Sequence, residues 1–284
     1  MNGQNDRTEG LSLKSHLDKA VKVLSQAEVP DASIDAWYLL SYVTGYSRAG
    51  YLLHENDEMS ERQAEQFHKL VDQRADRIPL QYLTGEQEFM GLSFTVNDSV
   101  LIPRQDTESL VEYALPYTKG KKVLDVCTGS GCIAISIAML GEPEQVDALD
   151  LSEAALQTAK GNAEHLGASV NFFRSDLLEQ VKDKYDVIVS NPPYIPPTVI
   201  QGLMPEVKEH EPLMALDGGD DGLVFYRRLA QEAKKYLLPE GMLFMEIGCE
   251  QGKQVKALFE EAGFGKVQVL PDLTGKDRVV WVCG

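Results

Sequence analysis

The sequence predicts an α/β protein in which a mostly parallel, doubly wound sheet follows a small helical region. Two observations support this fold class. Apolar residues recur at helical spacing up to about residue 85, and from about residue 106 short apolar runs alternate with helical patterns. A chain of 284 residues lies at the upper end of what one hydrophobic core supports, so we expect a small domain and a large one.

Residues 11–85 have the pattern of an N-terminal helical domain. Leu13, Leu17 and Val21 repeat at the spacing of one helix face. The preceding residues, 1–10, are polar and lack the apolar stretch of a secretory signal. We expect them to form a flexible tail.

The end of this domain carries a start signal and a stop signal for one more helix. Ser60 and Gln63 resemble a capping box, in which a hydroxyl and an amide satisfy the first backbone groups of a helix. Pro79 cannot continue a helix. A helix over 61–77 is therefore predicted.

Residues 86–105 are predicted to form a β-hairpin linker. Phe89 and Phe94 lie on either side of Gly91, and the spacing of apolar residues there changes from helical to alternating. The linker leads into the large domain, which we place at 106–284.

The large domain shows the alternation that gives parallel sheets. Helical patterns such as 132–140 and 152–166 separate the apolar runs, which favours right-handed crossovers between parallel strands. The last two runs are joined by a short connection, which favours an antiparallel pair at the sheet edge. The predicted strands are 121–127, 145–151, 170–176, 185–191, 241–248, 266–270 and 278–283.

Charge and composition exclude several classes of function. The net charge of −17 argues against a protein that wraps nucleic acid, because such binding depends on Lys and Arg. No apolar run approaches the length of a membrane helix, so a cytoplasmic protein without membrane contact is expected. The histidines and cysteines lack metal-ligand spacing, so no metal site is predicted. We expect all four cysteines, Cys127, Cys132, Cys249 and Cys283, to be buried thiols.

The first strand of the large domain ends in a glycine loop. In open α/β sheets ligands bind at the carboxyl ends of the strands. Gly129 and Gly131 allow a tight turn there, and Asp150 at the end of the next strand can accept hydrogen bonds from a ribose diol. The pattern indicates a nucleoside-containing cofactor. Gly129, Gly131 and Ala134 also satisfy the dinucleotide fingerprint, so an NAD-dependent oxidoreductase stays open.

The fourth strand ends in Asn191-Pro-Pro-Tyr194. Each proline disfavours the helical region for the residue before it, so the segment is held extended. The Asn191 side chain and the Pro192 backbone then offer two carbonyl oxygens to one NH₂ group, and the Tyr194 ring can pack on a planar group. This arrangement suits the amide of a glutamine or the amino group of an adenine.

A planar nitrogen of this kind is a poor nucleophile because its lone pair is delocalised. Two fixed acceptors that hold both hydrogens would favour pyramidalisation and turn the lone pair toward an electrophile. A sulfonium methyl donor fits, since attack needs no base beforehand and the proton can leave afterwards. The missing histidine or cysteine beside the motif agrees with this chemistry.

Several segments together resemble one family of methyltransferases. Arg77–Gly85, Leu101–Glu108 and Ser190–Pro193 are similar to the PrmC (HemK) family, and the likeness extends to Leu216–Gly219 and Glu246–Gly248. The resemblance runs from about residue 11 to the end of the chain. It implies a class I S-adenosylmethionine-dependent methyltransferase, with a Rossmann-like, mostly parallel seven-stranded sheet. It also implies methylation of the glutamine N5 in the Gly-Gly-Gln motif of class I peptide-chain release factors.

The resemblance also implies roles for individual residues. Those expected to contact S-adenosylmethionine, whose product is S-adenosylhomocysteine, are Cys127, Thr128, Gly129, Ser130, Gly131, Asp150, Asp176, Leu177 and Asn191. Those expected to hold the substrate are Asn191, Pro192, Pro193, Tyr194 and Arg104, with Asn191, Pro192 and Tyr194 as the catalytic group. Cys127 stands where the family usually has glycine, and Gln105 where it often has proline.

The remaining expectations concern partners and alternatives. A class I release factor is the implied protein substrate of a monomer that makes no direct contact with nucleic acid. The helical domain 11–85 is a second contact with this substrate or a stability element. Residues 196–222, rich in proline and glycine, are predicted to form a substrate-side wall or lid. An adenine-N6 DNA methyltransferase and a noncatalytic binding module remain alternatives.

Overall fold

The structure is a computed structural model, and it describes residues 11–283. The chain divides between Thr84 and Gly85 into two units, each with its own hydrophobic core. The predicted tail at 1–10 lies outside the described residues. No helix in the described range is long and apolar enough to cross a membrane.

The first unit is helical, as the spacing of its apolar residues predicts. Its core gathers one face of each longer helix, including Leu24, Leu39 and Phe67. A buried ion pair, in which Arg74 Nε lies 2.7 Å from Asp35 Oδ2, joins two helices of the unit. The helices are α1 (Leu13–Gln26), α2 (Ala32–Thr44), α3 (Arg48–His54), α4 (Glu61–Ala75) and α5 (Leu80–Thr84).

Helix α4 begins where the sequence predicts it and ends two residues early. The Ser60 hydroxyl accepts a hydrogen bond from the Gln63 backbone N at 3.4 Å and donates one to its side-chain oxygen at 2.7 Å. At the other end Arg77 has a positive φ of 66°, outside the right-handed helical region. The helix therefore stops at Ala75, and the predicted end at Arg77 was wrong.

The predicted hairpin is present in the second unit. Strands β1 (Glu86–Phe89) and β2 (Leu92–Thr95) pair in antiparallel fashion. The two residues between them, Met90 and Gly91, both have positive φ, as tight hairpin turns require. Phe89 and Phe94 are buried in a core of the second unit, so the hairpin packs as part of that unit.

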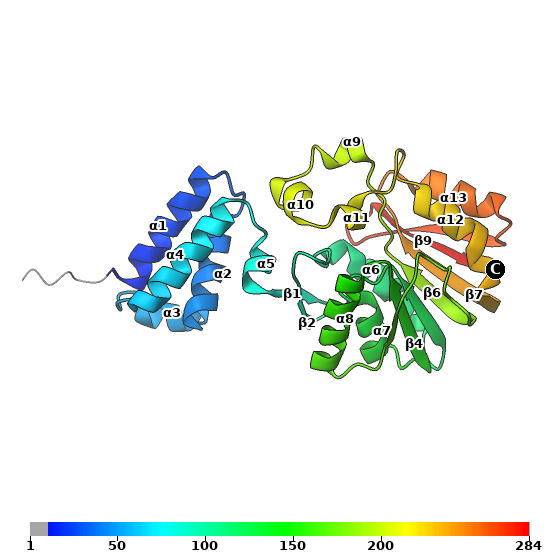
Figure 1. The fold of residues 1–284 in the computed structure, drawn as a ribbon, viewed down its shortest axis with the longest axis horizontal. Helices are drawn as coiled ribbons and strands as arrows, with labels where there is room; N and C mark the ends of the chain where they lie inside the picture. The colour runs from blue at the N-terminus through cyan, green and yellow to red at the C-terminus, as the bar shows by residue number, and fades with distance from the viewer. Residues whose placement is uncertain (1–10, 284) are drawn as a thin grey trace, which may run out of the picture. The chain divides into compact units, whose positions relative to one another are not determined.

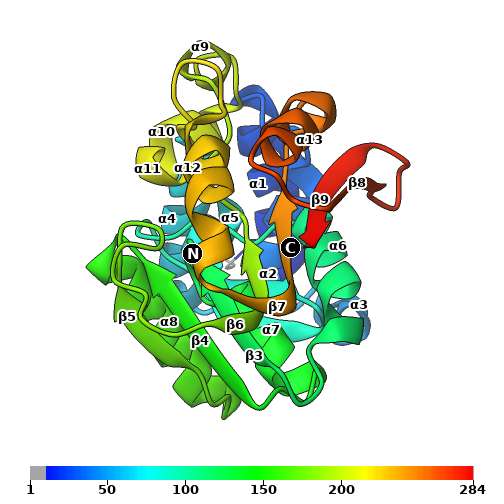
Figure 2. The same ribbon diagram turned by 90° about the vertical axis from the view of Figure 1, so that its right-hand side faces the viewer.

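A seven-stranded sheet in the order β5-β4-β3-β6-β7-β9-β8 forms the centre of the second unit (Figure 1, Figure 2). The first five strands in this order are parallel, and β9 runs antiparallel between β7 and β8. The predicted mostly parallel sheet is confirmed. The strands are β3 (Lys122–Val126), β4 (Gln145–Asp150), β5 (Asn171–Arg174), β6 (Tyr185–Ser190), β7 (Leu237–Glu246), β8 (Lys266–Pro271) and β9 (Asp277–Cys283).

Helices cover both faces of this sheet (Figure 2). Alternate residues of β3 point to opposite faces: Val123 joins one hydrophobic core and Leu124 the other. The core that contains Val123 is covered by α6 (Gln105–Ala114), α7 (Cys132–Leu140) and α8 (Glu153–Leu166). The core that contains Leu124 is covered by α12 (Val224–Glu232) and α13 (Gly252–Glu261). The arrangement is the predicted doubly wound fold.

The cysteines correct one expectation. Cys132 is buried, whereas Cys127 and Cys283 are partly exposed and Cys249 is exposed. The apolar pattern of β7 continues only to the buried Ile247, and Cys249 lies beyond it in the following loop. The prediction of four buried thiols is therefore confirmed only for Cys132: it was wrong for Cys249, and Cys127 and Cys283 are only partly buried.

Candidate active site

A cavity of about 330 Å³ opens at the carboxyl ends of β3, β4 and β6. This is the edge at which open α/β sheets bind their ligands, and the volume is typical of a small-molecule site. Most of the predicted site residues line it: Arg104, Cys127, Thr128, Gly129, Ser130, Asp150, Asp176, Leu177, Asn191 and Pro193. The chain thus brings into one wall residues that are far apart in the sequence.

The loop after β3 is shaped by backbone conformations that favour glycine. Gly129 and Gly131 have φ values of 56° and 82°, and Cys127 has 65°. A side chain in this region places its Cβ close to the following carbonyl oxygen, which costs about 1–2 kcal/mol. Cys127 therefore carries backbone strain at a position where glycine would carry none.

Asp150 at the end of β4 is tied to this loop. Its Oδ2 accepts a hydrogen bond from the Gly129 backbone N at 2.9 Å, and its Oδ1 accepts one from the Ser152 N at 2.9 Å. Burial raises the pKa of the carboxyl, and the backbone N–H groups lower it. Each carboxylate oxygen retains acceptor capacity, so Asp150 can still bind hydroxyl groups in the cavity.

Asp125 braces the loop from inside and was missed as a site residue. Its Oδ2 accepts hydrogen bonds from the Thr128 hydroxyl at 2.6 Å and from the Ala134 N at 3.2 Å. The side chain is fully buried, and burial raises its pKa to about 7. Its position at the start of the glycine loop was the available signal. Asp125 thereby fixes the turn at the Thr128 hydroxyl and at the beginning of helix α7.

Gly131 is placed differently from the other loop residues. A Cβ at this position would lie 2.9 Å from Ile135 Cδ1 and 3.1 Å from Ala159 Cβ. Gly131 is not among the residues that line the cavity. The structure therefore gives this glycine a packing reason, between the loop and α8, and its contact with a cofactor stays a prediction.

The segment after β5 contributes Asp176 and Leu177. Arg228 on α12 donates to Asp176 Oδ1 at 2.7 Å, an ion pair that sequence reasoning missed because its partners lie on separate elements. Leu177 has a φ of 45° and is buried, with part of it in the cavity wall. These residues extend the site beyond Asp150.

The Asn191–Tyr194 segment follows β6, next to the glycine loop. The Ser190 hydroxyl donates to the Val126 carbonyl at 2.8 Å and joins the two strand ends. Asn191 Nδ2 donates to the Thr107 hydroxyl oxygen at 3.3 Å. Asn191 and Pro193 line the cavity, whereas Pro192 and Tyr194 are not among its lining residues.

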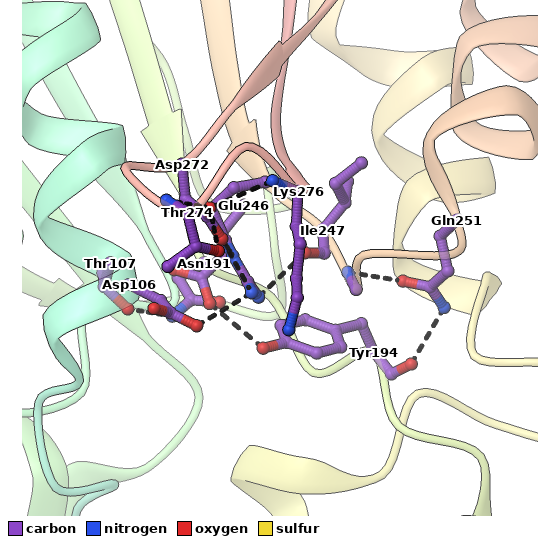
Figure 3. A network of polar contacts seen from close by, with 12 residues as sticks. Asp106, Thr107, Asn191, Tyr194, Glu246, Ile247, Gln251, Asp272, Thr274 and Lys276 are labelled. Carbon is purple, nitrogen blue, oxygen red and sulfur yellow. Dashed lines mark hydrogen bonds and ion pairs between the residues drawn. The ribbon is translucent and has the colours of Figure 1, made fainter.

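Tyr194 is held at both its side chain and its backbone (Figure 3). Its hydroxyl donates to Glu246 Oε1 at 3.0 Å, and its carbonyl accepts from Gln251 Nε2 at 3.0 Å. Burial raises the pKa of the phenol far above its ordinary value, and the nearby Glu246 charge adds to this effect. Tyr194 is therefore a neutral hydrogen-bond donor whose ring position is set by the end of β7.

Arg104 connects the cavity to the segment 196–222. Its guanidinium forms an ion pair with Glu211, whose side chain is almost fully buried and whose Oε2 also accepts from the Ile102 N at 3.4 Å. Burial raises the pKa of Glu211, and Arg104 lowers it. Three short helices shape this segment, α9 (Pro197–Ile200), α10 (Pro205–His210) and α11 (Leu213–Leu216).

The segment 196–222 forms part of the cavity wall. Pro212, Met214, Ala215 and Asp217 line the cavity together with the strand ends. The segment is therefore a wall of the cavity, and its place on the substrate side stays a prediction. Closure of the segment as a lid stays a prediction.

The comparisons with known proteins agree with this geometry. Residues 16–85 match the family described as the PrmC N-terminal domain, and residues 105–202 match the methyltransferase small domain. A release factor glutamine methyltransferase of Geobacter sulfurreducens is 41% identical over 279 residues, which cover 97% of this chain and 98% of that protein. The chain belongs to the release factor glutamine methyltransferase family. The protein of the same name from Clostridium acetobutylicum is 40% identical over 95% of this chain and 98% of its own length.

The fold of this family member is that of class I S-adenosylmethionine-dependent methyltransferases. A solved methyltransferase structure from Pyrococcus furiosus aligns with a TM-score of 0.53, covering 69% of this chain and 90% of that one at 18% identity. Family membership does not favour the two enzyme alternatives left open above, an NAD-dependent oxidoreductase and an adenine DNA methyltransferase. The resemblance seen in the sequence is confirmed.

Proposed function

We propose that the chain transfers a methyl group from S-adenosylmethionine to the side-chain amide nitrogen of the glutamine in the Gly-Gly-Gln motif of class I peptide-chain release factors. Membership in the family supports the reaction. The observation that carries the proposal in this chain is the position of Asn191, which lines the same cavity as Asp150. An acceptor for an amide and an acceptor for a ribose thus share one site.

The residues of the cavity fit S-adenosylmethionine. Asp150 retains acceptor capacity for a ribose diol, and Leu177 offers an apolar surface to a base. Ser130 Oγ and Asp125 Oδ1 are buried without a hydrogen-bond partner in the described part of the chain, beside the loop that would hold the cofactor. The group holding the cofactor would be Cys127, Thr128, Gly129, Ser130, Gly131, Asp150, Asp176, Leu177 and Asn191.

In the proposed mechanism, the cofactor supplies an electrophilic methyl group on a sulfonium. Asn191 Oδ1 and the Pro192 carbonyl accept the two hydrogens of the substrate amide, which turns its lone pair toward that methyl group. Tyr194 supports the planar amide with its ring, and Arg104 and Pro193 complete the substrate side. The proton leaves the nitrogen after attack, so these residues need only hold the amide and need not remove a proton first.

The partner and domain assignments follow from the same proposal. The proposed substrate is a translation factor, so we infer that the chain acts in the cytoplasm, as a monomer and without direct contact with nucleic acid. Residues 11–85 would be its second contact with the release factor, 86–105 the linker and 106–284 the methyltransferase domain. The first assignment predicts that exchanging exposed residues of 11–85 raises the KM for release factor without changing S-adenosylmethionine binding.

The test is a methylation assay with a mapped product. The purified chain is incubated with S-adenosylmethionine and unmethylated release factor, and the Gly-Gly-Gln peptide is analysed by mass spectrometry, with adenine-containing DNA in a parallel reaction. We expect one added methyl group on the glutamine and none on the DNA. Asn191→Ala should lower kcat by roughly 100- to 1,000-fold while the protein stays folded.

Asn171→Ala is the matched control, because Asn171 is an exposed asparagine at the start of β5, away from the carboxyl ends of the strands. It should methylate at the rate of the unsubstituted chain. Transfer to DNA alone, or an Asn191→Ala variant with full activity, would contradict the proposal.

A further inference from the structure

Two segments that resemble the family contain buried residues with no role in the proposed mechanism so far. They are Leu101–Glu108, which runs into α6, and Glu246–Gly248, which ends β7. In the structure, Thr107 from the first and Glu246 from the second lie beside Asn191 and Tyr194 (Figure 3). Both are buried, with 2% of each residue exposed.

The proposed mechanism requires one end of the Asn191 side chain to face the substrate. Nδ2 donates to Thr107 Oγ1 at 3.3 Å, and no described residue makes a hydrogen bond to Oδ1. The two ends of an amide have nearly the same shape but opposite hydrogen-bonding character. A flipped Asn191 would present an NH₂ group to the NH₂ group of the substrate, so its partner decides whether the site works.

Thr107 alone does not decide the direction, because a hydroxyl both donates and accepts. Its proton must be directed elsewhere for its oxygen to accept from Asn191. Glu246 offers an acceptor nearby, because its Oε2 is buried and has no hydrogen-bond partner among the described residues. Its Oε1 already accepts from Tyr194, so Oε2 is the oxygen left for the Thr107 hydroxyl, whose presence lowers the pKa of this carboxyl.

The groups around Glu246 act on its pKa in both directions, and the pKa is raised overall. Burial is the largest effect on its pKa and raises it, and the Asp106 charge on α6 acts in the same direction. Arg278 at the start of β9 opposes both, as do the hydroxyls of Thr107 and Tyr194. Arg278 is itself held by ion pairs to Asp106 at 2.8 Å and to Asp272 at 3.3 Å.

We propose that Thr107 and Glu246 are positioning residues that fix the direction of the Asn191 amide, so that its Oδ1 faces the substrate nitrogen. The inference rests on the proposed function. Glu246 accepts a hydrogen bond from the Thr107 hydroxyl, and the Thr107 oxygen accepts one from Asn191 Nδ2. Asn191 Oδ1 is then left as the acceptor for the substrate. The same carboxylate holds the Tyr194 hydroxyl, so one buried charge aligns both side chains of the motif.

The first test compares two substitutions of Thr107. Thr107→Val keeps the shape and removes the hydroxyl, whereas Thr107→Ser keeps the hydroxyl. We expect Thr107→Val to lower kcat for release factor methylation by about 10- to 100-fold. Thr107→Ser should stay within about threefold of the unsubstituted chain, and S-adenosylmethionine binding measured by calorimetry should be similar in both.

A matched control comes from another threonine that accepts from an asparagine amide. Asn97 Nδ2 donates to Thr158 Oγ1 at 3.1 Å, and Thr158 is not among the residues that line the cavity. Thr158→Val should leave kcat unchanged. Equal loss in Thr107→Val and Thr107→Ser, or no loss in Thr107→Val, would overturn the inference.

Glu246→Gln tests the other residue without changing its size. The glutamine amide can donate a hydrogen bond to the Thr107 oxygen. The Thr107 hydroxyl is then free to point its proton at Asn191, and it no longer favours Nδ2 over Oδ1 as its partner. We expect a loss of about tenfold in kcat with a smaller change in the KM for release factor. If Thr107→Val fails to fold, as shown by its melting curve, this variant decides the question, and full activity in it would refute the inference.

The unsubstituted chain separates the two proposals. If it fails to methylate release factor, the proposed function is wrong and the inference falls with it. If it methylates release factor and Thr107→Val and Glu246→Gln do so equally well, only the inference is wrong.

Discussion

The two neighbouring strand ends that form the candidate site are held in different ways. The loop after β3 is fixed mostly by groups within it or on the adjacent strand: Gly131 N donates to the Thr128 carbonyl at 2.9 Å, and Gly129 N to Asp150. One further bond comes from α8, where Asn162 Nδ2 donates to the Ser130 carbonyl at 2.9 Å. The segment after β6 is fixed by side chains from distant elements, Thr107 and Gln251 among them. The first therefore depends mainly on local backbone conformation, and the second on the completed fold.

This contrast predicts its largest effect at Gln251. Its Nε2 donates to the carbonyls of Tyr194 and Gly222, and its Oε1 accepts from Gly248 N at 2.9 Å. Gln251→Leu removes all three bonds and should lower kcat by about 100-fold through misplacement of the motif. Steady-state kinetics measure this, and Gln254→Leu, on the exposed face of α13, is the control. Equal activity of the two variants would show that the β6 segment needs no distant support.

In the glycine loop, the largest effect is expected on stability. Gly131→Ala would combine a positive φ with close contacts to Ile135 and Ala159, and should lower the free energy of unfolding by about 2–3 kcal/mol. Gly129→Ala has a positive φ but open space around its Cβ, so it should cost only about 1 kcal/mol. Urea unfolding of both variants measures the difference. Equal costs would mean that packing against α8 does not constrain the loop.

The buried Asp125 makes the stability of this loop pH-dependent. Its folded-state pKa of about 7 lies above the ordinary 3.8, so the folded state binds more protons between these values. Its stabilising contribution is complete below pH 3.8 and is lost as pH rises toward 7. Relative to Asp125→Asn, the unsubstituted chain should lose about 2 kcal/mol between pH 5 and 7. Melting curves of the ligand-free proteins test this, with the exposed Asp98→Asn as control. Parallel pH profiles for all three would count against it.

The smallest expected effect concerns Cys127. Cys127→Gly should relieve the strain of its φ of 65° and raise the free energy of unfolding by roughly 0.5–1 kcal/mol, after the entropy cost of an added glycine. Cys127→Ala keeps the Cβ and should give no such gain. Thermal unfolding distinguishes the two variants. If alanine stabilises as much as glycine, the thiol and not the backbone is the source of the strain.

The same contrast explains how much the sequence predicts. Strands such as β3 and β4 are short, largely apolar runs, and the turn after β3 needs glycines, so the parallel sheet and the position of the glycine loop and Asp150 at strand ends follow from local patterns. The motif after β6 is visible for the same reason, because its prolines act on their own neighbours. These features need no knowledge of the rest of the chain.

The partners of the β6 segment are less visible in the sequence. Thr107 lies on α6 and Glu246 at the end of β7, and no spacing rule connects either of them to Asn191 or Tyr194. The start of β7 was also missed: the strand begins at Leu237, although Pro239 and Gly241 interrupt its apolar run. Pairing with β6 stabilises this strand, and local propensity does not reveal it.

Arg278 connects the order in which the chain is synthesised with the order in which the contacts of the site can form. It lies on β9, which inserts between β7 and β8, and its guanidinium pairs with Asp106 beside Thr107. During synthesis the glycine loop and the Asn191 motif leave the ribosome well before this strand does. The ion pair between Arg278 and Asp106 therefore forms after the other contacts around the motif can form, because its two residues lie far apart in the sequence. We therefore expect a nascent chain to form its glycine loop early and to reach full activity only once its final strand is in place.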